Sequence, residues 1–253
     1  MIQIKSQREI SLMRRAGEIA AAARRLAGNM VAPGVTTREI DKAVFDFIRA
    51  HGAKPSFLKY NGYPASICIS VNNEVIHGIP GKRVLREGDI VSLDVGAALD
   101  GYHGDCAATI PCGKVSGEAM HLIEVTRQSF YEGIKFARPG NRISDISHAV
   151  QTYAEQNGCS VVRDYVGHGV GSKLHEAPEV PNFGPPGRGA RLFPGMTFAV
   201  EPMLNAGDYK IRRLSDGWTV VTLDGSLSAH FENTILITSG KPEILTVCPE
   251  DTE

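Results

Sequence analysis

A segment in the first half of the chain recurs in the second half, and this repeat constrains the fold more than any other feature. One set of residues around a turn and a helix returns 106 positions later, and a second set returns 107 positions later. The first set pairs Pro33-Gly34, Ile40, Ala43, Val44 and Gly52 with Pro139-Gly140, Ile146, Ala149, Val150 and Gly158, and the second pairs Leu85, Gly88 and Asp94 with Leu192, Gly195 and Glu201. A proline-glycine turn before a helix is common by itself, but two sets at nearly one offset favour a duplicated half-domain. We therefore expect one domain over residues 1–253, with halves of roughly 1–112 and 113–253.

Two capping boxes predict where helices begin. In Ser6-Gln7-Arg8-Glu9 and in Thr36-Thr37-Arg38-Glu39, the first and last side chains satisfy each other's free backbone N–H groups. Apolar residues at helical spacing follow each box, namely Ile10, Met13, Ala16, Gly17, Ala20, Ala23 and Ala27 after the first and Ile40, Ala43, Val44, Phe47 and Ile48 after the second. Gly28 and Gly52 mark the ends of these two helices.

Short segments rich in β-branched residues predict strands between the helices. They are Ile67 to Val71, Ile90 to Ala98, Tyr102 to Ile110, Thr197 to Val200, Trp218 to Leu223 and Ala229 to Ile237. Asp100-Gly101 and Asp224-Gly225 are turn signals of β-hairpins. Helices that alternate with antiparallel hairpins predict an α+β domain, with an antiparallel sheet covered by helices, rather than a parallel α/β sheet.

Charge and cysteine usage exclude several classes of protein. The formal net charge of −1 predicts no general attraction to nucleic acid or to an anionic membrane. The five cysteines are scattered without a Cys-x-x-Cys pair, so reduced thiols fit better than a disulfide framework or a zinc knuckle. Charged residues interrupt the N-terminus, and no apolar stretch approaches the length of a membrane span. We expect a cytoplasmic protein.

Four acidic residues lie within or beside apolar strands. If Asp100-Gly101 forms a two-residue turn, Asp94 faces Ala107, and Asp105 lies diagonally across from Asp94 on the same face, at about 7–8 Å between backbones. Glu201 follows Phe198-Ala199-Val200, and Glu232 precedes Thr234-Ile235-Leu236-Ile237. A buried carboxylate without a partner costs several kcal/mol, so these acids should be paired, protonated or bound to metal.

A histidine between glycines supports the metal interpretation. His168 lies between Gly167 and Gly169, where the backbone has freedom to approach a ligand. Isolated histidines are more often structural, but four acids with one imidazole suit two divalent ions such as Co, Mn, Fe or Zn. Two ions about 3.5–4 Å apart activate a water molecule in aminopeptidases and phosphatases. His77 and His175 are further candidates in this pattern.

The residues described above resemble those of the methionine aminopeptidases, in the short type I form of the pita-bread metallopeptidases. The similarity extends over nearly the whole chain. The motifs that carry it are Asn72-Asn73-Glu74-Val75-Ile76-His77-Gly78-Ile79-Pro80, Gly88-Asp89-Ile90-Val91-Ser92-Leu93-Asp94, Gly167-His168-Gly169-Val170-Gly171 and Glu201-Pro202. The resemblance implies a pseudo-twofold pita-bread fold, in agreement with the internal repeat, and removal of N-terminal methionine when the second residue is small.

The resemblance also implies a role for each polar residue. The expected metal ligands are Asp94, Asp105, His168, Glu201 and Glu232, with Asp105 and Glu232 bridging two divalent ions. A hydroxide between the ions would attack the first peptide carbonyl, with Glu201 as the proton shuttle. His175 would stabilise the oxyanion, and His77 would contact the scissile nitrogen.

A methionine pocket is expected from the same resemblance at Tyr60, Tyr63, Cys68 and Trp218. Aromatic edges and a thiol make favourable contacts with a thioether, although core packing is the commoner role of a single aromatic residue. Phe57 stands where some relatives carry cysteine, and Leu174 stands where some carry phenylalanine. Both residues keep the surface apolar, so they bear on fine specificity rather than on the reaction.

Two other functions fit parts of the same pattern. An Xaa-Pro peptidase of the pita-bread group usually has a sizeable N-terminal domain, whereas only about thirty residues precede Pro33 here. A metal-free binding module on this fold would have lost ligands, and all five stand in the sequence. We expect a monomeric aminopeptidase that acts on the N-terminal peptides of nascent proteins, and association with the ribosome stays open.

Overall fold

The helices begin at capping residues in the computed structural model, which describes residues 2–248. Both predicted capping boxes form, between Ser6 and Glu9 and between Thr36 and Glu39. The described residues form four α-helices and one short 3-10 helix, namely α1 (Gln7–Asn29), α2 (Thr37–Ala50), α3 (Gly117–Ile134), α4 (Ile143–Gln156) and η1 (Tyr60–Gly62). Helix α4 contains the residues that repeat those of α2. Helix α3 was not predicted by any sequence pattern.

The described part of the chain also forms strands that pair antiparallel throughout. They are β1 (Lys54–Pro55), β2 (Cys68–Val71), β3 (Glu74–Ile76), β4 (Ile90–Leu99), β5 (Tyr102–Pro111), β6 (Ser160–Val161), β7 (Gly167–Gly169), β8 (Glu176–Val180), β9 (Thr197–Val200), β10 (Met203–Asn205), β11 (Ile211–Arg213), β12 (Val220–Thr222), β13 (Ser228–His230), β14 (Glu232–Leu236) and β15 (Glu243–Ile244). The main sheet runs in the order β1-β4-β5-β14-β9-β7-β8, with β2 on β4 and β15 on β14. Two smaller sheets have the orders β13-β10-β6 and β11-β12-β3.

The centre of the main sheet is the pair β5–β14, and each half of the chain supplies one of these strands. Strand β4 lies outside β5, and strand β9 lies outside β14. The pairs β4–β5 and β9–β14 therefore occupy matching places on either side of the centre. Each pair carries two of the four acids, because Glu201 directly follows β9 and Glu232 begins β14.

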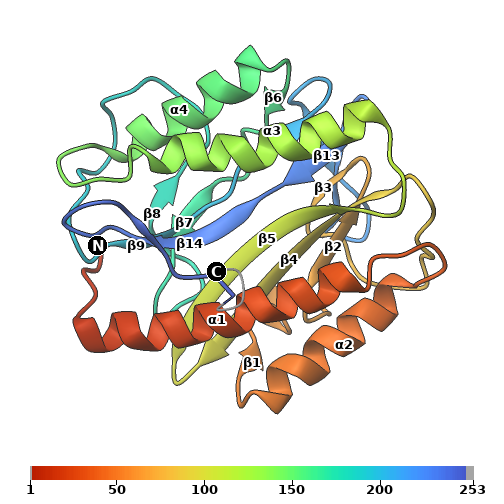
Figure 1. The fold of residues 1–253 in the computed structure, drawn as a ribbon, viewed down its shortest axis with the longest axis horizontal. Coiled ribbons are helices and arrows are strands. Elements are labelled where there is room, and N and C mark those ends of the chain that lie inside the picture. The colour runs from red at the N-terminus through yellow and green to blue at the C-terminus, as the bar shows by residue number, and fades with distance from the viewer. Residues whose placement is uncertain (1, 249–253) are drawn as a thin grey trace.

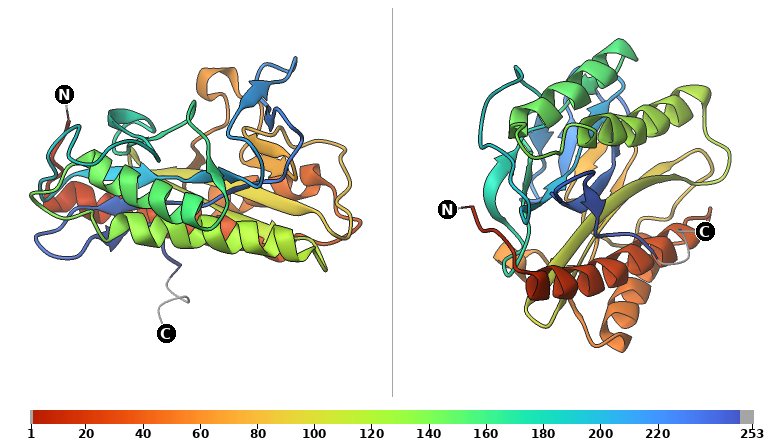
Figure 2. Two further views of the ribbon diagram at one scale, coloured as in Figure 1. Left: turned by 90° about the horizontal axis from the view of Figure 1, so that it is seen from above. Right: turned by 60° about the vertical axis from the view of Figure 1, so that its left-hand side comes forward.

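The helices lie on one side of this sheet and leave the other side for the site. Figure 1 shows α1 and α2 along one half and α3 and α4 along the other, with the main strands between them. The apolar face of α1 packs with α2 and strands β2, β4 and β5 in one core cluster, and Phe130 of α3 packs with β9 and β14 in another. Seen from above, α1 and α3 lie on one face, whereas the β11–β12 hairpin stands out on the opposite face (Figure 2).

Two predictions about strands are wrong. The segment Ala229 to Ile237 divides at Phe231 into β13 and β14, because His230 pairs with Met203 in a small sheet whereas Glu232 pairs with Ala107 in the main sheet. The residues around Asp224-Gly225 turn, but no hairpin follows: β12 pairs with β11 and β3, and β13 pairs with β10. The other predicted hairpin forms in the expected register, with Leu99 opposite Tyr102 and Asp94 opposite Ala107.

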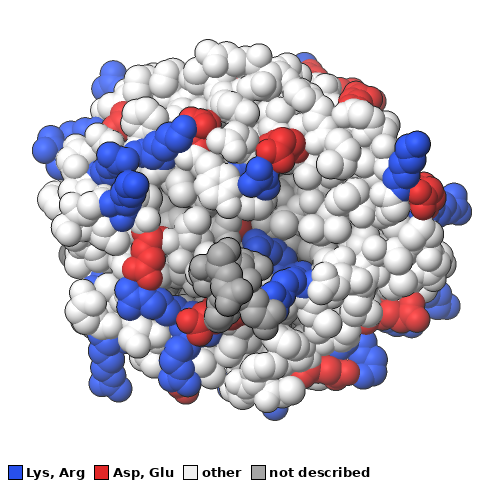
Figure 3. Space-filling view, viewed as in Figure 1, with Lys and Arg blue, Asp and Glu red and all other residues white. Residues whose placement is uncertain are grey.

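The surface shows no field of one charge on the face that carries the helices. Basic and acidic side chains intermingle over that face (Figure 3), as expected from the small net charge. Within residues 2–248, none of the helices combines the length and the apolar character that a membrane span requires.

Candidate metal centre and substrate cavity

Strand register brings the four acids to one face of the main sheet. Ala107 of β5 lies opposite Asp94 on one side and opposite Glu232 on the other. Asp105 precedes Ala107 by two residues, so its side chain points to the same face. Glu201 follows Val200, which pairs with Asn233 beside Glu232. The carboxylates therefore converge around the β5–β14 pair, and all four are buried.

Burial and mutual repulsion disfavour the charged form of these acids. Burial raises the pKa of Asp94 from its ordinary value of 3.8 to about 7. Burial, and then the charge of Asp94, raise the pKa of Asp105 well above its usual range. Burial and the charges of neighbouring acids likewise raise the pKa of Glu201 and of Glu232. A bound cation would reverse this balance by stabilising the carboxylates.

Several polar atoms at this place have no hydrogen-bond partner. Among the described residues, the buried side-chain atoms without a partner include Asp94 Oδ1, Asp105 Oδ1, Glu232 Oε1 and His230 Nε2. Such atoms are rare in folded proteins, and each normally costs about 1–3 kcal/mol. Two sets of potential ligand atoms also lie within 4.8 Å of one another, namely Asp94, His230 and Glu232, and Asp105, His168 and Glu232. The donor set thus fits divalent cations.

The tautomer of His168 is determined by its own strand. Its Nδ1 lies 3.0 Å from the carbonyl oxygen of Gly169, which accepts only, so Nδ1 carries the proton. Nε2 is then a free acceptor, and it lies 3.5 Å from Glu201 Oε1 and 3.8 Å from Asp105 Oδ2. Burial lowers the pKa of His168 to about 3, so the ring is neutral. Metal-binding histidines commonly donate a hydrogen bond from their other ring N–H to a backbone carbonyl in this way.

A cavity of about 130 Å³ opens directly on the acids. Every residue that the sequence predicts for the site lines it, including Phe57 and Leu174. The polar part of its lining contains Asp94, Asp105, His168, Glu201, Glu232, His77 and His175, and the rest contains Tyr60, Tyr63, Cys68 and Trp218. A largely apolar cavity with a few convergent polar groups is typical of a small-ligand site.

The apolar wall of the cavity is a cluster of packed side chains. Tyr63 meets Trp218 edge to face, with ring centroids 5.1 Å apart. The hydroxyl of Tyr63 donates to the carbonyl of Gly78 over 2.8 Å, so its polar end is satisfied by the backbone beside His77. Cys68 lies opposite Asp94 in the β2–β4 pair, which joins the apolar wall to the acids.

Two histidines stand at the border between the acids and the apolar wall. His175 Nδ1 lies 2.8 Å from the Tyr60 hydroxyl, and its ring centroid is 3.9 Å from that of His168. His77 has a φ of 61°, an uncommon conformation for a non-glycine residue. An added Cβ at the following Gly78 would lie 2.2 Å from the carbonyl oxygen of Ile69. Close backbone packing therefore holds His77 in this conformation.

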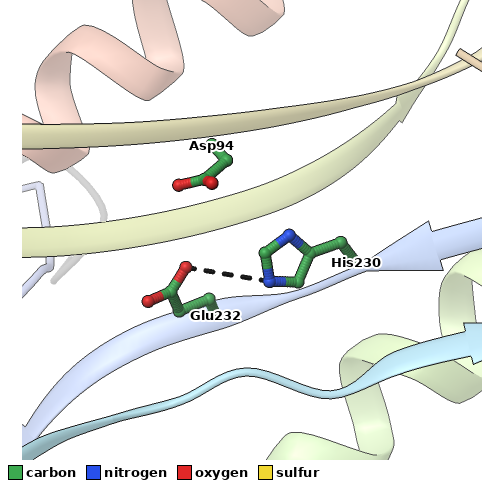
Figure 4. A group of neighbouring side chains, drawn as sticks. All are labelled: Asp94, His230 and Glu232. Carbon is green, nitrogen blue, oxygen red and sulfur yellow. Dashed lines mark ion pairs between the residues drawn. The ribbon is translucent and has the colours of Figure 1, made fainter. Parts of the chain in front are cut away.

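Sequence patterns did not point to several residues at the site. Ile76, Tyr165 and Val166 also line the cavity. His230 is the more consequential omission, because its ring faces Asp94 and Glu232 (Figure 4). The dipeptide His230-Phe231 before Glu232 is typical of an ordinary strand. The only sequence signal of a site residue was a titratable side chain two positions before an acid.

Comparison with known proteins identifies close relatives. The model of metallopeptidase family M24 matches residues 11–239. A methionine aminopeptidase of Clostridium perfringens is 55% identical over 247 residues, covering 98% of this chain and 99% of the relative. Methionine aminopeptidase 1 of Bacillus subtilis is 53% identical over 246 residues, covering 97% and 99% of the two chains.

Solved structures agree with these relatives. The crystal structure of methionine aminopeptidase from Thermotoga maritima is 47% identical and superposes with a TM-score of 0.96, covering 97% of this chain and 99% of that one. A prolidase from Pyrococcus furiosus is 23% identical with a TM-score of 0.79, and this chain covers 65% of it. The prolidase therefore shares the fold only.

Proposed function

The chain belongs to the methionine aminopeptidases of metallopeptidase family M24, and on this premise we propose how its residues divide the work of removing an N-terminal methionine. It is a metal-dependent aminopeptidase with the pita-bread fold. The observation that carries our assignment is the cavity itself, because an apolar wall and a cluster of buried acids with unpartnered oxygens face each other across it.

We assign the acids and His168 to two divalent ions. Glu232 belongs to both groups of ligand atoms, and Glu232 together with Asp105 would be shared by both ions. Asp94 would complete one side, and His168 with Glu201 would complete the other, as supported by the distances from His168 Nε2 to Glu201 and Asp105. When bound, such ions lower the pKa of water and polarise a carbonyl oxygen. Cobalt, manganese, iron and zinc all suit this donor set.

Glu201 and the two border histidines would handle protons and developing charge. Glu201 lines the cavity next to His168, where its carboxylate would reach both the other acids and a bound substrate. The Tyr60 hydroxyl donates to His175 Nδ1 in the tautomer that we assign, so that Nε2 carries a proton. This N–H would stabilise negative charge on the oxygen of the cleaved bond. His77, held by its backbone, would contact the scissile nitrogen.

The apolar wall would bind the methionine side chain. Tyr60, Tyr63, Cys68 and Trp218 offer aromatic edges and a thiol, which suit a flexible thioether. A β-branched first residue would be too wide at its Cβ to fit between the walls of so small a cavity. We propose a preference for a small second residue, because a larger side chain would meet the rim formed by the border histidines.

We further propose that residues 1–253 act as one catalytic domain with halves of roughly 1–112 and 113–253. The equivalent placement of β4–β5 and β9–β14 supports this division. We also propose that the enzyme is a cytoplasmic monomer that acts on the N-terminal peptides of nascent proteins. Size-exclusion chromatography with light scattering checks the oligomeric state, and a larger particle at micromolar concentration would contradict it.

Metal analysis combined with a peptide series tests the proposed function. Protein stripped with a chelator should be inactive, and two equivalents of Co, Mn or Fe should restore cleavage of Met-Ala-Ser. Met-Ile and Met-Lys peptides should be cleaved far more slowly than Met-Ala peptides. Full activity without metal would refute the metal assignment, and faster cleavage of Ala-Pro than of Met-Ala-Ser would favour an Xaa-Pro peptidase instead.

A further inference from the structure

His230 is a buried imidazole that the assignment above leaves without a role. Its side chain is 1% exposed, and its Nε2 is buried without a hydrogen-bond partner. That nitrogen lies 3.7 Å from Glu232 Oε2 and 4.0 Å from Glu201 Oε2. Figure 4 shows the ring directed at the space between Asp94 and Glu232. A buried nitrogen surrounded by carboxylates needs a partner, which points to a ligand at this place.

The backbone around His230 holds the ring in this position. The Thr109 hydroxyl accepts from the His230 N–H over 2.8 Å and donates to the His230 carbonyl over 2.9 Å. Ser92 Oγ lies 2.8 Å from the same hydroxyl and belongs to the strand that carries Asp94. His230 is therefore fastened to the two strands that carry Asp94 and Asp105, rather than placed by chance near them.

The distances distinguish a shared ion from a hydrogen bond. A direct N–H···O bond would require about 2.7–3.2 Å, and both distances from His230 Nε2 exceed that range. Two atoms that bind one ion at about 2.0–2.2 Å lie roughly 3–4.4 Å from each other. His168, the histidine already assigned as a ligand, lies at 3.5 and 3.8 Å from its two carboxylates. The two imidazoles therefore stand in the same relation to the acid cluster.

We propose that His230 is a second imidazole ligand of the metal centre, bound through Nε2 to the ion that Asp94 and Glu232 hold. The proposal rests on the proposed function, in which that ion has only oxygen ligands. His230 does not line the cavity, so it reaches the ion from the buried side and leaves the open side to substrate. An added imidazole favours borderline ions such as Zn, Co and Fe over Mg and Ca at this position.

Metal binding to five versions of the full chain tests the proposal without relying on activity. They are the wild type, His230→Gln, His230→Ala, His168→Ala and, as a matched control, His148→Gln on an exposed part of α4. Glutamine places a neutral N–H donor near the position of Nε2 but is a poor metal ligand. Cobalt and zinc binding are measured by competition with a chromophoric chelator, and circular dichroism checks that each variant folds.

In both His230 variants we expect the metal affinity of one of the two binding events to fall by more than about 100-fold. A loss of about 100-fold is the upper end for residues that only orient a metal ligand. His168→Ala should weaken the other event, and His148→Gln should change neither. X-ray absorption of the wild type loaded with two zinc ions should show about one imidazole per ion, which is two bound imidazoles per chain, and His230→Gln should retain only one bound imidazole per chain. The wild-type spectrum tests the proposal even if the variants do not fold.

Three outcomes would overturn the assignment of His230. Unchanged affinity in both His230 variants means that it is no ligand. If metal affinity falls in His230→Ala but is normal in His230→Gln, then His230 only donates a hydrogen bond to a carboxylate. Half an imidazole per ion in the wild type also excludes it. If the wild type binds no ion, or if His168→Ala leaves binding unchanged, the metal assignment under the proposed function fails instead.

Discussion

A buried ion pair joins the N-terminal segment to the loop that carries His175. Lys5 Nζ lies 2.6 Å from Glu176 Oε2, and the two side chains are only 2% and 7% exposed. Gly171 packs against both, because an added Cβ there would lie 2.5 Å from Glu176 Oε1 and 2.6 Å from Lys5 Cε. Both charged groups are therefore largely withdrawn from solvent.

Replacing Lys5 with methionine should destabilise the protein by about 3 kcal/mol. Methionine keeps most of the apolar stem of lysine but leaves the Glu176 carboxylate buried without its cation. Breaking a buried pair in this way costs about 3–5 kcal/mol. Glu176 keeps a bond from the Lys173 N–H at 3.1 Å and a longer contact to Ser172 Oγ at 3.4 Å, so we expect the lower end of the range. At about 2–4 °C per kcal/mol for a chain of this size, the melting temperature should fall by about 6–12 °C.

Urea unfolding of the metal-loaded protein measures this effect. The matched control is Lys173→Met, which removes an exposed lysine from the same loop and should cost less than about 0.5 kcal/mol. The double variant Lys5→Met with Glu176→Gln should be more stable than Lys5→Met alone, because it removes the unpaired charge. Turnover should also fall, since Glu176 directly follows His175. A loss under about 1 kcal/mol for Lys5→Met, or simple additivity in the double variant, would refute the reasoning.

Three further predictions concern the metal centre. His175→Ala should lower kcat by several decades and leave metal content unchanged, whereas Asp105→Ala should lose metal; elemental analysis beside peptide turnover would contradict these roles if the two variants behaved alike. Chelator should lower the melting temperature and metal should restore it, because each bound ion adds about 2.7 kcal/mol to the free energy of unfolding when the free ion is at 100 times its Kd; calorimetry with and without metal would show no difference if the acids bind nothing. In the metal-free protein the pKa of Asp94, raised to about 7 from 3.8, means that the folded state holds its proton more tightly than the unfolded state. The contribution of Asp94 to stability should therefore be lost as pH rises from about 4 to 7, so the wild type should lose stability relative to Asp94→Asn over that window in urea titrations, and a difference that stays constant with pH would contradict it.

Local interactions in the sequence determined part of the fold. The two capping boxes fix the starts of α1 and α2, because the partners lie three residues apart and need no tertiary contact. The Asp100-Gly101 turn sets the register of β4 and β5, so the meeting of Asp94 and Asp105 on one face follows from turn geometry alone. The acid residues in apolar strands likewise revealed a site, because a buried carboxylate requires a partner wherever the strand goes.

Only the tertiary structure decided which distant strands meet. The predicted strand from Ala229 to Ile237 divides because β10 of the second half pairs with its first part, whereas β5 of the first half pairs with its second part. The Asp224-Gly225 turn joins strands that pair elsewhere for the same reason. His230 came to the acids through that division, and no pattern around it distinguishes a core histidine from a ligand. Strand partners separated by a hundred residues or more are chosen by burial of the whole sheet, which no local pattern records.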